Sequence, residues 1–405
     1  MRTSQPNKAL YVHHGGGAGG AANSLLFLLI NLDPQRFAPT VACDFRTAES
    51  RKFFQRNGID PVNLRIAPFA HTSRSWQLTT ARGLAKFARW VLLDQPASRR
   101  AFRRLLREVR PDLVHLNGLS ILPLAPVAAA LDIPVVQHVR ESINEGAFGV
   151  RKAWLRRLAG KYASHMIFIC HDGRQRMGDL AAPASVVYNP IDFSKFRRFD
   201  GGPIREQLEI PAGWTALFFP GGSMLDIKGI EPFIGALARV RTAHPRTCAI
   251  VPSLDAPAHP RDRIRHRVER EIRDNSLQDC ILRVPFSNNV ERYYAASDIV
   301  VAPFVSPHFS RAVIEAGAMA KPVIGSRIGG ITEVLEDGEV GLLATPGDAE
   351  DLASKICALI EQPEMAAAMG KAGNARARKH FDAAHHADAV MDIYRLILDR
   401  ARNAR

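Results

Sequence analysis

Short apolar runs alternate with amphipathic helical stretches along most of the chain. In the first half, apolar runs occur at residues 9–12, 40–43, 113–116, 133–137 and 166–170, bounded by turn-forming residues. Apolar residues at helical spacing separate these runs, for example at 21–31 and 151–162. Strands that alternate with helices build parallel sheets. The first half is therefore predicted to be an α/β domain with a doubly wound sheet.

The same alternation starts again after a polar, glycine-containing segment at residues 200–213. Further strands are expected at 215–219, 247–251, 281–284, 298–303 and 322–326, with helices at 230–242, 262–274, 311–320, 349–362 and 365–381. A final helix is expected to run to Arg402. The pattern predicts a second domain of the same Rossmann-like type.

We therefore expect an N-terminal domain at 1–199, a connection at 200–213, a second domain at 214–384, and a C-terminal helix at 385–405. The last helix is expected to pack back toward the first domain. In open α/β sheets, ligands bind outside the carboxyl ends of the strands. Two such domains are expected to face each other across a cleft that holds the substrate.

Composition is typical of a globular protein in a reducing compartment. Hydrophobic residues make up 46% and charged residues 23% of the 405 positions. The five cysteines are scattered and never spaced as CxxC, which argues against a disulfide framework and a structural zinc site. The N-terminus does not resemble a signal peptide, and the longest apolar stretch is far shorter than the roughly 20 residues of a spanning helix. We expect a cytoplasmic protein.

Positive charge is concentrated in the first half. Residues 1–200 contain 29 Lys and Arg against 14 Asp and Glu, a net charge of +15, whereas residues 201–405 have a net charge of −1. Two basic segments, 98–110 and 151–162, have apolar residues at helical spacing and are expected to form amphipathic helices. Their basic faces are either solvated or in peripheral contact with an anionic membrane surface. No nucleic-acid partner is expected.

Two glycine-rich turns follow the first strand of each predicted domain. The turn at residues 15–20 includes Gly19 and Gly20 and opens a helix, so backbone N–H groups and the positive end of the helix favour an anion. It lacks the Lys-Ser/Thr pair of a P-loop. The second turn, PGGSMLDIKGI at 220–230, contains Gly222 and Ser223 and places Lys228 just before a helix. Lys228 is a candidate partner for a diphosphate.

The segment PFVSPHFSRAVIEAGAMAKPVIGSRIGGITEV at 303–334 resembles the glycosyl transferase group 1 signature of glycosyltransferase family 4. Supporting pieces include GGAANSLLFLL at 19–29, RPDLVHLNG at 110–118, IPVVQHVRE at 133–141, VVYNPID at 186–192 and EVGLLATPGD at 339–348. The resemblance covers nearly the whole chain. It implies the two-domain GT-B fold and a retaining glycosyltransferase that uses a nucleoside diphosphate sugar.

The resemblance also assigns roles in the second domain. The family's glutamate at the position of Glu315 hydrogen-bonds the nucleotide ribose, and backbone amides matching Phe309, Ser310 and Arg311 hold the diphosphate. A carboxylate suits two ribose hydroxyls, and a helix N-terminus favours phosphate charge. Glu315 and Lys228 are accordingly expected to be catalytic as well as donor-binding.

Two positions depart from the family pattern. The family usually has a glutamate seven residues before the second one, where this chain has His308. A histidine there either hydrogen-bonds the donor sugar or has no function. The family also usually has an arginine five or six residues before its lysine, where this chain has Ser223 or Gly222. We expect Arg311 to supply the missing positive charge.

In the first domain, the family places a histidine near the donor sugar, and the resemblance implies that its counterpart in this chain, His138, is a catalytic residue. Arg140 and Glu141 follow it and are candidates for acceptor binding, with Glu141 as a weaker candidate for acid/base chemistry. This domain is expected to bind a glycan or glycolipid acceptor. The family and the basic first half together suggest a role in synthesis of cell-envelope polysaccharide, lipopolysaccharide or glycolipid.

No metal site is expected. His13 and His14, like His385 and His386, are adjacent pairs that do not converge on one ion, and no carboxylate or cysteine cluster completes them. The charge of the leaving diphosphate must then be balanced by Lys228, Arg311 and backbone amides. We expect neither a metal nor another cofactor beyond the donor substrate.

Two alternatives to a glycosyltransferase stay open at this point. A nucleotide-sugar 2-epimerase shares the two-domain plan and needs no acceptor. A catalytically inactive member of the family could bind a nucleotide sugar or scaffold an assembly complex, given His308 and Ser223. Nucleotide release that depends on an acceptor would distinguish the three.

Overall fold

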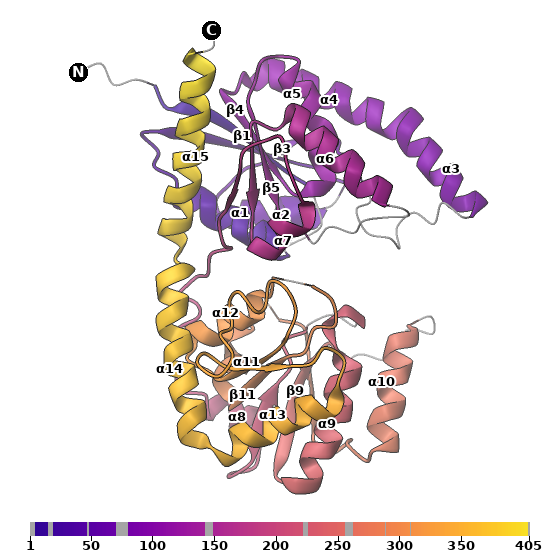
Figure 1. Ribbon diagram of the computed structural model, residues 1–405, viewed down its shortest axis with the longest axis vertical. Coiled ribbons are helices and arrows are strands. Elements are labelled where there is room, and N and C mark those ends of the chain that lie inside the picture. Colours follow the sequence, from indigo (N-terminus) through magenta and orange to yellow (C-terminus); the bar gives the residue numbers. More distant parts are fainter. Residues whose placement is uncertain are drawn as a thin grey trace. The chain divides into compact units, whose positions relative to one another are not determined.

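A computed structural model of the chain describes residues 5–14, 19–46, 48–69, 80–141, 149–221, 226–255, 262–287, 289–307 and 309–403. The chain forms two compact units (Figure 1). Unit 1 comprises Met1–Pro190 together with Ala383–Arg405, and unit 2 comprises Ile191–Asp382. Unit 1 therefore ends at residue 190, where residue 199 was expected, and unit 2 includes the expected connection at 200–213. Ile191 belongs to unit 2, where it pairs with Asp382 and donates its N–H to the carbonyl of Phe381.

Unit 1 contains a seven-stranded sheet in the order β3-β2-β1-β4-β5-β6-β7, and neighbouring strands are parallel. The order reverses beside β1, as expected of a doubly wound sheet. The strands are β1 (Asn7–His13), β2 (Phe37–Cys43), β3 (Val62–Asn63), β4 (Leu113–Asn117), β5 (Val135–Val139), β6 (His165–Phe168) and β7 (Ala184–Val186).

Helices cover both faces of this sheet, so alternate residues of a strand enter different cores. Leu10 and Val12 of β1 pack in one core with α4, α5 and α6, whereas Ala9 and Tyr11 pack in the other with α1, α2 and α15. The helices are α1 (Gly20–Ile30), α2 (Ala48–Arg56), α3 (Ala81–Arg89), η1 (Trp90–Asp94), α4 (Gln95–Val109), η2 (Leu119–Leu124), α5 (Ala125–Ala129), α6 (Val150–Tyr162), α7 (His171–Met177) and α15 (Ala383–Asn403).

Unit 2 contains a six-stranded parallel sheet in the order β10-β9-β8-β11-β12-β13. The strands are β8 (Thr215–Phe218), β9 (Thr247–Pro252), β10 (Ile281–Val284), β11 (Ile299–Ala302), β12 (Val323–Ser326) and β13 (Leu342–Ala344). The helices are α8 (Gly202–Gln207), η4 (Asp226–Lys228), α9 (Ile230–Ala243), α10 (Arg263–Asp274), α11 (Glu291–Ala296), α12 (Arg311–Ala318), α13 (Ala349–Glu361) and α14 (Pro363–His380).

The predicted strands and helices lie close to the observed ones, with a few exceptions. The run expected as a strand at 166–170 is wrong at its end, because Cys170 caps α7 by accepting a hydrogen bond from the N–H of Gly173. The expected connection at 200–213 contains α8, from which Arg205 donates to the carbonyls of Ala296 and Trp214. The sequence interpretation also missed short elements such as α11 and β13.

The last helix, α15, packs on unit 1. Its Tyr394 is fully buried, and the phenolic oxygen lies 2.6 Å from Nδ1 of His115 in β4. The sulfur of Met391 accepts the N–H of Asp33 at 3.5 Å. The helix therefore completes the core that also holds α1, although it lies at the opposite end of the sequence.

Candidate functional site

In unit 2, the chain runs from β11 through a loop into α12, and half of the predicted donor-binding residues belong to this loop and helix. Phe309 is 6% exposed and stacks edge-on with Phe381 at 6.5 Å between ring centroids. Ser310 is fully buried at the start of α12, and its Oγ has no hydrogen-bond partner among the described residues. Backbone N–H groups in the first turn of a helix have no intrahelical acceptor, so this end of α12 suits an anion.

Glu315 lies one turn into α12 and is held through both carboxylate oxygens. The hydroxyl of Tyr294, in α11, donates to Oε2 at 3.0 Å. Nε of Arg311 lies 3.5 Å from Oε1, an i,i+4 ion pair within the helix. The side chain of Glu315 is 13% exposed, so the carboxylate is orientated without being sealed from solvent. Tyr294 is buried, and burial together with Glu315 raises its pKa well above the usual value.

Lys228 contacts the start of the same loop. Its Nζ lies 4.6 Å from the ring centroid of Phe304, just after β11, and burial lowers the pKa of the ammonium group. The N–H of Val305 donates to the carbonyl of Ile227 at 3.1 Å and joins the two segments. Lys228 and the start of α12 are thus attached to one loop.

This close approach depends on Gly229. Its φ of +73° lies in the left-handed region, and an added Cβ would lie 1.7 Å from the carbonyl oxygen of Pro303. No residue with a side chain fits there without displacing one of the two segments. The glycine after Lys228 is therefore required because only a residue without a side chain fits beside Pro303.

Three predicted donor residues, Gly222, Ser223 and His308, lie outside the residues that the structure describes.

In unit 1, Gly19 caps α1 with extended backbone, and its carbonyl accepts the N–H groups of Ala22 and Asn23. Gly19 and Gly20 are exposed, and a Cβ on Gly19 would meet nothing within 4 Å. The amino end of α1 is therefore open to a ligand.

The predicted acceptor residues, Arg140 and Glu141, directly follow β5, whose carboxyl end lies beside that of the neighbouring parallel strand β4. Nε of Arg140 donates to Oδ1 of Asn117 at 2.8 Å, and its Nη1 donates to Oδ1 of Asn189 at 2.5 Å. Asn117 in turn lies 3.0 Å from Nδ1 of His13 at the end of β1. Arg140 is 8% exposed. Its observed contacts therefore link three segments of unit 1.

Glu141 follows directly and points toward the ends of β1 and β4. Its Oε2 accepts the N–H groups of Leu119 at 2.8 Å and Arg140 at 3.2 Å, and its Oε1 lies 4.0 Å from Nε2 of His14. Gly118, with φ of +130°, allows this position, because a Cβ there would lie 2.8 Å from Oε1. Backbone donors thus fix one oxygen of a carboxylate whose other oxygen has no hydrogen-bond partner among the described residues.

His138 lies inside β5 and is fully buried. Its ring centroid is 5.2 Å from that of His115 and 6.1 Å from that of His386, in α15. Neither of its ring nitrogens has a hydrogen-bond partner among the described residues. Burial, followed by the charge of Arg140, lowers the pKa values of His138 and His115 well below the usual value. His138 is accordingly a neutral imidazole in a buried cluster.

Several residues around these sites were missed by sequence reasoning. Tyr294, Asn117 and Asn189 hold predicted site residues through side-chain hydrogen bonds, and His386 contacts His138 from the far end of the chain. From the sequence, His385 and His386 were weighed only as possible metal ligands, and the contact of His386 with His138 was not predicted. Within the described ranges, no group of three or more His, Cys, Asp or Glu residues is arranged to hold a metal ion.

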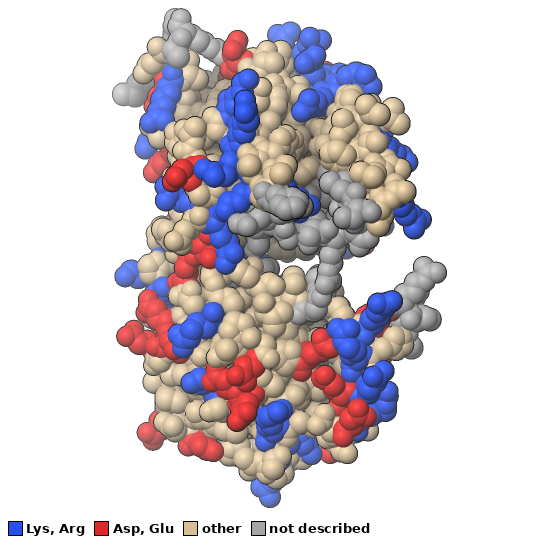
Figure 2. Space-filling model, turned by 45° about the vertical axis from the view of Figure 1, so that its right-hand side comes forward, with Lys and Arg blue, Asp and Glu red and all other residues tan. Residues whose placement is uncertain are grey.

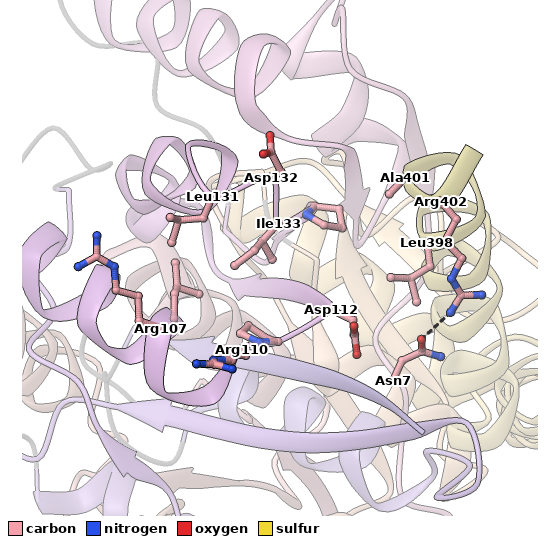
Figure 3. A pocket seen from close by; sticks show the side chains of 13 residues that line it. Asn7, Arg107, Arg110, Asp112, Leu131, Asp132, Ile133, Leu398, Ala401 and Arg402 are labelled. Carbon is pink, nitrogen blue, oxygen red and sulfur yellow. Dashed lines mark hydrogen bonds between the residues drawn. The ribbon is translucent and has the colours of Figure 1, made fainter. Parts of the chain in front are cut away.

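A pocket of about 560 Å³ lies in unit 1 at the amino ends of strands β1, β4 and β5, the ends away from Arg140 and Glu141 (Figure 3). It is lined by the ends of α4 and α15 and by the segments that enter β1, β4 and β5. On one side of the pocket, Nη2 of Arg402 donates to Oδ1 of Asn7 at 2.9 Å. Because it opens at the amino ends of the strands, it is separate from the carboxyl-edge residues described above.

Two family descriptions match the chain. "Glycosyltransferase Family 4" matches residues 18–195, and "Glycosyl transferases group 1" matches residues 215–362.

Among curated relatives, D-inositol 3-phosphate glycosyltransferase of Saccharomonospora viridis is 28% identical over 228 residues, which are 54% of this chain and 52% of that protein. The enzyme of that name from Rhodococcus jostii is 36% identical over 216 residues, 52% of this chain and 47% of that protein. The chain spans about half the length of the curated relatives it matches.

Among solved structures, Anabaena HepE in complex with UDP-glucose superposes with a TM-score of 0.77 at 21% identity. The match covers 96% of this chain and 99% of that one. This likeness concerns the fold, a GT-B arrangement of two Rossmann-like domains. Taken with the two matched family descriptions, it completes the identification: the chain belongs to glycosyltransferase family 4, the glycosyl transferases of group 1.

Proposed function

We propose that the protein is a retaining glycosyltransferase that moves a sugar from a nucleoside diphosphate sugar to an acceptor hydroxyl. The observation that carries this proposal is the cluster in unit 2 where Glu315, the start of α12 and Lys228 gather around one loop. It combines an acceptor for sugar hydroxyls with two sources of positive potential for phosphates. Family membership supports the same assignment.

In this proposal, the carboxylate of Glu315 accepts hydrogen bonds from the ribose hydroxyls of the donor. Tyr294 and Arg311 occupy one lone-pair direction on each oxygen, and a carboxylate has about four such positions. Two positions therefore remain for the ribose. The diphosphate lies at the amino end of α12, near the backbone N–H groups of Ser310 and Arg311.

The main chemical task is to stabilise the leaving nucleoside diphosphate. Cleavage of the sugar–phosphate bond places negative charge on the diphosphate and positive charge on the sugar ring. The ammonium group of Lys228, at a partly desolvated position, is the proposed counter-charge, and Arg311 adds a second one. We propose that these groups act without a divalent metal ion, and that His308, Gly222 and Ser223 complete the donor site.

Unit 1 is proposed to bind the acceptor through Arg140 and Glu141, with His138 beside the donor sugar and Gly19 and Gly20 at the phosphates. The acceptor class proposed is a glycan or glycolipid of the cell envelope. Because His138 is fully buried, its contact with a sugar would require the neighbouring segments to move. Anabaena HepE, which shares the fold, was solved in complex with UDP-glucose, so this nucleotide sugar is the first donor to test on this chain.

The direct test is nucleotide release from a panel of nucleoside diphosphate sugars, with and without glycan and glycolipid acceptors. Acceptor-dependent release with retained anomeric configuration, measured by NMR, supports the proposal. Glu315→Gln and Lys228→Ala should lower kcat/KM at least about tenfold each, while Glu364→Gln and Lys371→Ala on α14 should not. Inversion at the sugar C2 without acceptor would instead indicate an epimerase, and donor binding without turnover would indicate an inactive scaffold.

A further inference from the structure

The helix α3 and the helical turn η1 contact the core of unit 1 through Phe87 and Trp90, while most of their other residues face solvent. Seven of the nine residues of α3 are exposed, only Gly83 is buried, and no residue of η1 is buried. Figure 1 shows α3 extending α4 outward, beyond the sheet. The backbone stays helical from α3 through η1 into α4, so this segment is the outer end of one long helix. The exposed apolar residues therefore need an explanation.

The apolar and basic residues of this segment lie on different sides of the helix. Leu84 and Leu92 lie eight residues apart, with Ala88 between them at four-residue spacing, whereas Arg82, Lys86 and Arg89 recur at i, i+4 and i+7. Leu84 is 54% exposed and Leu92 is 70% exposed. The segment is thus an amphipathic helix that presents both faces outward.

A second exposed apolar group adjoins it on α6. Val150 is 66% exposed and Trp154 is 36% exposed, one helical turn apart. The ring of Phe69 lies between the two groups, 4.8 Å from Trp154 and 5.5 Å from Trp90 in η1, centroid to centroid. We define the apolar ridge as Leu84, Val91, Leu92, Leu93, Val150 and Trp154; it holds half of the large exposed apolar side chains found in the described part of the chain.

The helices that carry the ridge, together with α4, which continues from η1, are strongly basic. Residues 80–110 and 149–162 together contain 14 Lys and Arg but only two acidic residues, Asp94 and Glu108. Their net charge of +12 accounts for most of the +14 of the whole chain. On the face drawn in Figure 2, blue side chains outnumber red ones on unit 1, whereas blue and red are closer to balance on unit 2. Exposed apolar residues bordered by basic ones match the surface of an anionic bilayer.

We propose that the apolar ridge seats unit 1 on an anionic lipid bilayer, with α3 and η1 lying in the plane of the headgroups. None of the helices in the described ranges is long and apolar enough to cross a membrane, which fits a surface contact. Leucines and Trp154 enter the headgroup boundary, and Arg82, Lys86 and Arg89 contact lipid phosphates. This inference does not depend on the identity of the donor or acceptor.

The test is sedimentation of the full-length protein with vesicles of phosphatidylcholine alone or with phosphatidylglycerol. We expect binding to the anionic vesicles only, weakened by added salt because exposed charges are screened. Leu92→Gln together with Leu93→Gln should abolish sedimentation. Phe286→Gln, an equally exposed apolar residue of unit 2, should have no effect.

A charge variant provides the second arm. Replacing Arg82, Lys86 and Arg89 by Gln should weaken binding on the order of a hundredfold, since each basic residue near the surface contributes about fivefold. The same change at Arg263, Arg270 and Arg273, exposed on α10, is the control for net charge. Circular dichroism verifies folding of each variant.

Three results would overturn the proposal. One is equal binding to neutral and anionic vesicles. Another is binding to anionic vesicles that neither the Leu92 and Leu93 variant nor the basic-residue variant weakens. The third is a wild-type dimer that the Leu92 and Leu93 substitutions convert to a monomer while vesicles bind neither form. In that case the ridge is an interface between two copies of this chain.

Discussion

The phenolic oxygen of Tyr294 lies 3.0 Å from Oε2 of Glu315, and the tyrosine ring is completely buried. The ring packs edge-on against Phe218 at 4.8 Å and against Phe196 at 6.0 Å, so its position is set by the core of unit 2. Through this one hydroxyl, the core orientates the carboxylate proposed to bind the donor ribose. Tyr294 is therefore a positioning residue in our interpretation.

Replacing Tyr294 by Phe should raise the KM for the donor by roughly tenfold while kcat changes little, because a hydrogen bond to a charged group contributes about 1.5–3 kcal/mol. With a donor that lacks the ribose 2′-hydroxyl, the difference between variant and wild type should shrink. Tyr293→Phe is a matched control, since its hydroxyl donates to the carbonyl of Pro285 instead. An unchanged KM in Tyr294→Phe would contradict the positioning role.

Gly229→Ala should displace Lys228 from the loop after β11 and lower donor affinity strongly. The new Cβ would lie 1.7 Å from the carbonyl oxygen of Pro303, so one segment must move. Gly213→Ala separates this clash from backbone strain, because Gly213 has the same φ of +73° with nothing within 4 Å. The control should lose only about 1–2 kcal/mol of stability. Calorimetric titration with UDP and thermal unfolding measure the two effects, and equal behaviour of both variants would refute the steric argument.

Arg311→Ala should reduce kcat/KM by about ten- to a hundredfold, because it removes a positive charge beside the proposed diphosphate site. It also releases the carboxylate of Glu315 from the ion pair at 3.5 Å. Arg327→Ala breaks a surface ion pair with Asp337 in the same unit and is the control. Steady-state kinetics decide the question: unchanged turnover and nucleotide affinity in Arg311→Ala would show that the missing family arginine has no replacement here.

Activity should survive removal of divalent cations. In the proposed mechanism, Lys228, Arg311 and backbone N–H groups balance the charge of the leaving diphosphate. Turnover measured after dialysis against EDTA should stay within about twofold of the untreated enzyme, and added Mg²⁺ or Mn²⁺ should not increase it by more. A loss of activity that Mn²⁺ alone restores would refute this part of the proposal.

The stability of unit 1 should fall as the pH falls below about 6.5, the ordinary histidine pKa. Burial lowers the pKa values of His13, His115 and His138, so the unfolded chain binds protons in this range that the folded chain does not. Stability is therefore greatest above pH 6.5 and is lost on acidification, by up to about 1.4 kcal/mol per pH unit for each such histidine.

Urea unfolding at a series of pH values between about 5.5 and 7.5, which spans the ordinary histidine pKa, measures this dependence. Arg140 and His386 face His138 from neighbouring segments and oppose its protonation. His138→Phe should make the pH dependence shallower, whereas His266→Gln, at an exposed position on α10, should leave it unchanged. A pH dependence of the same steepness in His138→Phe would rule out a contribution from this histidine.

The periodicity of apolar residues was enough to predict two parallel α/β domains and most of their strands and helices. This succeeds because strands buried on both faces and helices buried on one face leave separate local patterns. The predicted run at 215–219 is β8, and that at 281–284 is β10. Two local features also pointed to the segments proposed to contact the donor. One is a glycine-rich turn before a helix, and the other is the family-like segment that contains Glu315.

The tertiary structure alone decided which side chains hold those residues. Tyr294 lies 21 positions before Glu315, and Asn189 lies 49 positions after Arg140, so no local pattern connects either pair. Burial was equally invisible: His138 was expected beside a sugar and is enclosed by His115 and by His386 from the last helix. Periodicity reports which face of an element is apolar. The partners of a buried polar group depend on contacts between elements that are distant in the chain, and these form only when the sheet and its helices pack.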